Sequence, residues 1–190
     1  MKKLLPLALL ALISGGVGFF AYLGLSGGLS GDGSGSGMPA DAPLPAPAAA
    51  QAAEFAPAFE LPDLDGQPRQ GSEWDGTVRV VNFWATWCPP CIREIPVLMD
   101  IQQEYGEQGL QVIGIAIDET EAVLEFAEEF GFNYPVLIGQ EDAMAVGNAF
   151  LDGFIGLPFT AFTDRDGRVV KVHTGELHRE QLEEILAGLL

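Results

Sequence analysis

Residues 78–91 read VRVVNFWATWCPPC and place a pair of cysteines directly after a nearly continuous apolar run. Residues 78–85 are rich in β-branched and aromatic side chains, which is typical of a strand buried on both faces of a sheet. Beyond the cysteines, residues 92–105 have the apolar spacing of an α-helix. The stretch therefore predicts a central strand that leads through Cys88 and Cys91 into a helix.

The placement of the two sulfurs assigns a different role to each. A cysteine at the start of a helix faces unpaired N–H groups and the positive end of the helix dipole, which both favour the thiolate. Cys88 is therefore predicted to attack, and Cys91, one turn further along, to resolve the mixed disulfide. Pro89 and Pro90 suit a first turn but carry no N–H group, so fewer donors remain for the thiolate. No other cofactor is expected, because the pair itself would cycle between dithiol and disulfide.

A zinc site and a plain local disulfide are the alternative interpretations of the pair. The chain has 2 cysteines, so a four-ligand zinc site would lack its second pair of ligands. His173 and His178 are far from the pair in sequence, and solvated or helix-capping roles suit them better than metal binding. A Cys-x-x-Cys between a strand and a helix favours redox chemistry, and no metal site is expected.

Length and charge limit the remaining classes of function. The chain has 190 residues and a formal net charge of -18. Its length allows one ordinary domain with extra segments. Nucleic acid is excluded as a partner because phosphate binding needs a basic surface. We interpret the acidity as a solvated surface and expect a monomer.

The N-terminal segments predict a tethered domain. Residues 1–25 begin with two lysines and continue as an uncharged, mainly apolar stretch. A spanning helix needs ~20 such residues, whereas the core of a cleaved signal peptide has roughly 7–15, so the length favours an anchor over cleavage. Residues 26–53 are rich in Gly and Ser and then in Ala and Pro, which indicates a flexible linker. The basic flank would place a domain at 54–190 on the outer side of the cytoplasmic membrane.

The rest of the chain alternates between the periods of strand and helix, which predicts an α/β domain with a mixed central sheet flanked by helices. We expect strands at 59–61, 110–117, 136–138, 159–163 and 168–173, and helices at 121–130, 141–150 and 178–189.

The segment from Val81 to Cys91, followed by Glu94 and Pro96, resembles the active site of TlpA-like and ResA-like proteins, the membrane-tethered branch of the thioredoxin superfamily. Residues 156–160, GLPFT, are similar to that family's second landmark. The resemblance covers 54–190 and implies a thioredoxin-like fold with an N-terminal β extension and a helix–strand insertion. It also implies an oxidoreductase that reduces disulfides in exported proteins, such as apocytochromes c or copper-site proteins. An integral-membrane dithiol donor would re-reduce it.

The resemblance also suggests roles for single residues. Pro158 would be a cis-proline that faces the cysteines and aligns a substrate strand, the alternative being an ordinary trans proline. Glu94, on the same helix face as Cys91, would handle protons near the sulfurs, the alternative being a solvated carboxylate. Asn82 stands where cytoplasmic thioredoxins carry a buried Asp. Since it cannot titrate, it would form hydrogen bonds beneath the site or simply be a satisfied core amide.

Two apolar residues near these positions are candidates for substrate contact. Trp87 precedes the attacking cysteine and is expected on a surface that substrate covers, whereas Trp84 on the strand is expected in the core. Leu157 is a candidate to line a partner groove, with plain packing as the alternative.

Three other functions compete with disulfide reduction. A net oxidant or isomerase would differ only in reduction potential, which the sequence does not determine. A docking or metal-delivery module is disfavoured by the intact Cys-x-x-Cys. A peroxidase is disfavoured because no separate nucleophile loop is visible.

Overall fold

The computed structural model describes residues 51–154 and 156–190, so the predicted anchor at 1–25 and most of the predicted linker lie outside the described residues. Residues 51–53, which the sequence assigned to the linker, are attached to the domain. Ala53 donates its N–H to the carbonyl of Phe150 at 2.9 Å, and Ala52 forms a β-bridge with Leu151. Within the described ranges, every helix is too short or too polar to cross a membrane.

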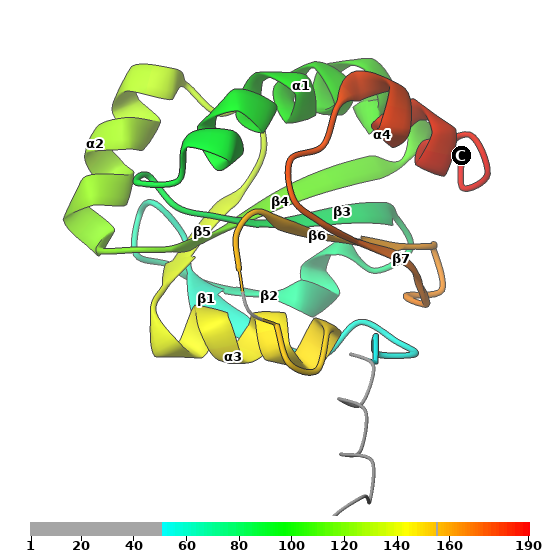
Figure 1. The fold of residues 1–190 in the computed structure, drawn as a ribbon, viewed down its shortest axis with the longest axis horizontal. Helices are drawn as coiled ribbons and strands as arrows, with labels where there is room; N and C mark the ends of the chain where they lie inside the picture. The colour runs from blue at the N-terminus through cyan, green and yellow to red at the C-terminus, as the bar shows by residue number, and fades with distance from the viewer. Residues whose placement is uncertain (1–50, 155) are drawn as a thin grey trace, which may run out of the picture. The chain divides into compact units, whose positions relative to one another are not determined.

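A mixed sheet of 5 strands in the order β5-β4-β3-β6-β7 forms the centre of the domain (Figure 1). Its strands are β3 (Val78–Trp84), β4 (Leu110–Ile117), β5 (Val136–Gly139), β6 (Phe159–Thr163) and β7 (Val169–Thr174). β3 is parallel to β4 and antiparallel to β6, and every one of its residues is buried. The predicted central strand is therefore confirmed, and it has the buried, apolar character expected of a strand covered on both faces.

Helices cover the two faces of the sheet. Figure 1 shows α1 (Pro89–Tyr105) and α4 (Arg179–Leu186) on one side and α3 (Glu141–Phe150) on the other. α2 (Thr120–Phe130) lies beside β5, at the edge of the α1 side. Each face has its own apolar cluster, one under α1 and the other under α3. This is the α/β arrangement predicted from the sequence.

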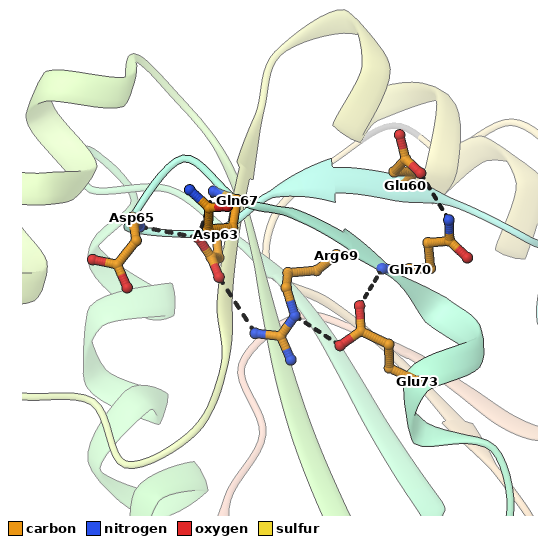
Figure 2. A network of polar contacts seen from close by, with 7 residues as sticks. All are labelled: Glu60, Asp63, Asp65, Gln67, Arg69, Gln70 and Glu73. Atoms are coloured by element: carbon orange, nitrogen blue, oxygen red, sulfur yellow. Dashed lines mark hydrogen bonds and ion pairs between the residues drawn. The ribbon is translucent and has the colours of Figure 1, made fainter.

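The predicted N-terminal β extension is a hairpin of β1 (Glu60–Pro62) and β2 (Pro68–Gln70), which leads into a 3-10 turn at Gly71–Trp74. Figure 2 shows the polar network that surrounds it. Asp63 Oδ1 accepts the N–H groups of Asp65 and Gln67 at 3.0 and 2.9 Å, which closes the turn. Arg69 spans the hairpin, with its guanidinium 3.4 Å from Asp63 Oδ2 and 2.8 Å from Glu73 Oε2. Exposed ion pairs contribute little stability each. We therefore infer that this network mainly fixes the shape of the hairpin.

The observed elements differ from the predicted ones mainly at their ends. α1 begins at Pro89 instead of residue 92, because both prolines fit in its first turn and Cys88 serves as its N-cap. β1 lies one residue later than predicted. The strand β2 was not predicted, because Pro68, Arg69 and Gln70 do not alternate between apolar and polar side chains. In the structure β2 pairs only with β1.

Gly114 on β4 leaves room for two aromatic rings beneath α1. A Cβ atom at this position would lie 3.1 Å from Tyr134 Cε2 and 3.2 Å from Trp84 Nε1. Trp84 is fully buried and Tyr134 is 6% exposed, so both rings are enclosed in the core. Gly114 therefore allows Trp84 and Tyr134 to pack closely against β4.

We expect Gly114→Ala to lower the free energy of unfolding by about 1–3 kcal/mol, because overpacking a filled core displaces its neighbours. Urea unfolding of both proteins at one pH measures the difference. Gly188→Ala is the matched control, since a Cβ there meets nothing within 4 Å. Equal stabilities for the two variants would contradict the prediction.

Candidate active site

Cys88 and Cys91 lie where β3 ends and α1 begins, and they form a disulfide with Cα atoms 5.3 Å apart. Cys88 is the N-cap of α1, and its Sγ accepts the N–H of Cys91 at 3.4 Å. Pro89 and Pro90 fill the first two helical positions, so the N–H of Cys91 is the first that the helix can offer. Cys88 is 3% exposed and Cys91 is fully buried, and an incoming reactant can therefore reach only Cys88. This is the asymmetry that the predicted roles require.

Glu94 lies one turn after Cys91 on α1, with its side chain completely buried. Asn82 on β3 donates from Nδ2 to Glu94 Oε1 at 2.7 Å. The N–H of Leu177, just before α4, donates to Glu94 Oε2 at 2.8 Å. The structure thus brings the predicted residues Asn82 and Glu94 together under the cysteine turn, and the solvated alternative for Glu94 is wrong.

Burial changes the proton affinity of this carboxyl. Loss of hydration raises the pKa of Glu94 from 4.5 to about 7, although the hydrogen bonds from Leu177 and Asn82 act in the opposite direction. The negative charge of Glu176 raises this pKa further. Glu94 can therefore gain or lose a proton near neutral pH, one helical turn from the sulfur of Cys91.

Asn82 also links Glu94 to the neighbouring strand. Its Nδ2 donates a second hydrogen bond, to Thr160 Oγ1 on β6 at 3.0 Å, while its Oδ1 has no partner among the described residues. An amide can donate to a carboxylate or, after rotation about its Cβ–Cγ bond, accept from a carboxylic acid. Asn82 can thus form a hydrogen bond with either protonation state of Glu94, which a second carboxylate could not do without repulsion.

Pro158 lies beside the end of β3, and its peptide bond has the cis form that the resemblance implies. The antiparallel pair Phe83–Phe159 places Pro158 next to Trp84 along the register, and the Leu157–Pro158 peptide is cis. The carbonyl of Pro158 accepts the N–H of Gly175 at 2.8 Å, so a substrate backbone would have to use neighbouring peptide groups. Leu157 packs against the apolar cluster that includes both cysteines.

Trp84 and Trp87 differ in solvent exposure as predicted. Trp84 is fully buried, whereas Trp87 is 67% exposed next to the reactive sulfur. A large exposed aromatic side chain beside a reactive group is suited to contact with a partner molecule.

Asp118 is a residue of this site that the sequence reasoning missed. Thr86, two residues before Cys88, donates both its N–H and its hydroxyl to Asp118 Oδ2, at 2.8 and 2.6 Å. Asp118 directly follows β4, which is parallel to β3. Because the carboxyl ends of parallel strands meet at one edge of a sheet, this position could have been found by pairing the two predicted strands.

The described ranges contain no group of three or more His, Cys, Asp and Glu side chains arranged to hold a metal ion. His178 is the N-cap residue of α4, and its N–H bonds to Gln181 Oε1 at 3.1 Å, in agreement with the predicted capping role. His173 lies in β7.

Comparison with known proteins gives the same assignment as the geometry. Residues 51–189 match the family model of the Redoxin proteins. The chain belongs to the Redoxin family. It is 34% identical to the thiol-disulfide oxidoreductase ResA of Geobacillus thermodenitrificans over 70% of this chain and 75% of that protein. It is 35% identical to ResA of Bacillus thuringiensis subsp. konkukian over 69% of this chain and 74% of that protein.

A solved structure shows the same fold. The thiol:disulfide interchange protein of Chlorobium tepidum matches with a TM-score of 0.65 and 30% identity, over 71% of this chain and 94% of that one. This Redoxin is therefore a thiol-disulfide oxidoreductase with the thioredoxin-like fold predicted from its sequence. Proteins of this redox family use the cysteine pair rather than a cofactor, and this chain has such a pair in Cys88 and Cys91.

The raised pKa of Glu94 predicts a pH dependence of stability. Between pH 4.5 and about 7 the folded chain holds a proton on Glu94 that the unfolded chain has lost. The contribution of Glu94 is therefore complete below pH 4.5 and is lost as the pH rises through about 7. In the wild type, Glu94 should therefore lower the free energy of unfolding by on the order of 3 kcal/mol between pH ~4.5 and pH ~8. Glu94→Gln should lack this part of the pH dependence. Glu128→Gln, at an exposed position, should unfold with the wild-type pH dependence.

Glu94→Gln should also slow disulfide exchange and remove the step near pH 7 from the pH–rate profile of this exchange. Asn82→Ala should instead move this step to higher pH, because the hydrogen bond from Asn82 lowers the pKa of Glu94. Stopped-flow rates with a neutral disulfide measure both effects. Superimposable profiles for the wild type and Glu94→Gln would contradict a proton-handling role.

Proposed function

We propose that this Redoxin oxidoreductase acts as a reductant of disulfides in exported partner proteins. The observation that carries the proposal is the position of Cys91, which is enclosed and one helical turn from a buried carboxyl with a pKa of about 7. The Cys88 thiolate attacks one sulfur of the partner disulfide and forms a mixed disulfide, and the other partner sulfur leaves as a thiolate. Cys91 then gives its proton to ionised Glu94 and attacks Cys88. The second partner sulfur leaves as a thiolate, and the two partner thiolates take up one proton from Glu94 and one from solvent. The cysteine pair ends as the Cys88–Cys91 disulfide, and the two electrons that reduced the partner have come from it.

The compartment follows from the N-terminal sequence. Residues 1–25 act as a membrane anchor, residues 26–50 as a linker, and the domain works on the extracytoplasmic side of the cytoplasmic membrane. The two lysines at the start and the long apolar stretch support this orientation. An integral-membrane dithiol donor returns electrons to Cys88 and Cys91. The exported substrates include apocytochromes c or copper-site proteins, as the resemblance to the ResA-like branch implies.

The direction of electron flow is tested by the reduction potential of the full chain equilibrated with glutathione. We expect a value nearer to that of thioredoxin, about −270 mV, than to that of the oxidant DsbA, about −120 mV. Tryptophan fluorescence, to which Trp84 and Trp87 next to the cysteines contribute, and alkylation of the free thiols report the fraction reduced. A potential close to that of DsbA would replace the proposal with a net oxidant or isomerase.

The order of attack is tested by trapping. Cys91→Ser should accumulate mixed disulfides between Cys88 and exported proteins, because the buried resolving sulfur is missing. Non-reducing gels and mass spectrometry of the full chain expressed in cells identify these species. Cys88→Ser is the matched control and should trap none. Full biological function in Cys88→Ser would instead indicate a non-catalytic docking module.

A further inference from the structure

The two sides of the cysteine turn differ in charge. On the side of the cis peptide there is a hollow of about 430 Å³ that contains Leu157 and Pro158 and is lined only by Gly, Leu, Pro and Thr residues. On the other side is a hollow of about 390 Å³, here called the Trp87 hollow. Its lining has an apolar part, here called the floor, of Trp87, Ile117 and Met144, and an acidic part, here called the rim, of Asp118, Glu119 and Glu141.

The apolar floor of the Trp87 hollow is open to solvent next to the reactive sulfur. Trp87 is 67% exposed and Met144 is 47% exposed, and both rank among the few large apolar side chains on the described surface. Trp87 directly precedes Cys88, and the backbone before it is held to Asp118 through Thr86. A partner whose sulfur reaches Cys88 must therefore lie close to this floor.

The carboxylates of the rim have no cationic partner among the described residues. Asp118 accepts from Thr86, and Glu119 Oε2 accepts from Gln140 Nε2 at 3.0 Å. None of the residues that line the hollow is basic. The net charge of -18 does not explain this arrangement, because the hollow on the Pro158 side belongs to the same chain and has no charged residue.

We propose that the Trp87 hollow receives a lysine or arginine side chain next to the reacting cysteine of the substrate protein. The hydrocarbon part of such a side chain covers apolar surface while its charged end stays near solvent and carboxylates. The exposed face of Trp87 adds a favourable contact with the cation. The uncharged hollow on the Pro158 side then takes the opposite flank of the same cysteine. This inference rests on the proposed reduction of partner disulfides and names the chemistry of the partner.

The test uses peptides that each contain one intramolecular disulfide. Lys, Gln or Glu is placed directly before one cysteine in the first set of peptides and directly after it in the second set, and the peptides are otherwise identical. The reduced full chain is mixed with each peptide at low and at high salt. Each rate is divided by the rate of the same peptide with dithiothreitol, which removes intrinsic differences in reactivity. We expect Lys to exceed Glu by about tenfold at low salt on one flank only, and the ratio to fall at high salt.

Two double variants separate a local effect from an overall one. Glu119→Gln with Glu141→Gln should reduce the ratio between the Lys and Glu peptides. Glu128→Gln with Glu129→Gln, in the last turn of α2 and exposed, changes the net charge equally and should keep the ratio. If the ratio between the Lys and Glu peptides falls equally in both double variants, the proposal is overturned.

The Gln peptide separates this inference from the proposed function. If the chain reduces all peptides at one normalised rate, the inference is wrong and the reductase proposal stands. If it reduces none of them, both are wrong.

Discussion

The carboxyl of Glu94, buried between α1 and the sheet, is the constraint around which the active site is arranged. A buried carboxyl is costly unless it is protonated or hydrogen-bonded. Here β3 contributes Asn82 at 2.7 Å, and the segment before α4 contributes the N–H of Leu177 at 2.8 Å. Through Asn82 the contact reaches Thr160 on β6. One side chain therefore ties together the two strands and the helix that position Cys88, Cys91 and Pro158.

The same burial connects structure with chemistry. A glutamate in water at pH 7 is fully ionised, whereas Glu94 has a pKa of about 7 because it has lost its hydration. In the mechanism proposed above, this raised pKa lets Glu94 accept the proton of the enclosed Cys91. Asn82 supports this function because an amide keeps a hydrogen bond to Glu94 in both protonation states, and its own charge never changes.

Local pattern was enough to predict the central strand, the helix after it and the difference between Cys88 and Cys91, since all depend on residues near one another in sequence. The cis peptide before Pro158 was expected only through the resemblance, because composition and spacing favour a trans bond. The contacts of Asp118 and Leu177 were not predicted. Both join residues far apart in the chain, Thr86 to Asp118 and Glu94 to Leu177, and neither partner has a distinctive local pattern. β2 was missed because its polar residues pair only with β1.

The helix–strand insertion, formed by α2 and β5, adds a second surface to the site. α2 begins immediately after Asp118 and Glu119, and the chain returns through β5 to Gln140 and Glu141 at the same edge of the sheet. These two connections carry the acidic rim, whereas the Pro158 side is formed by the connection into β6. The chemistry at Cys88 and the charge around it are therefore supplied by different parts of the chain. The carboxylates of the rim can change without disturbing the contact between Glu94 and Asn82, so the proposed substrate preference and the proposed proton handling depend on different parts of the fold.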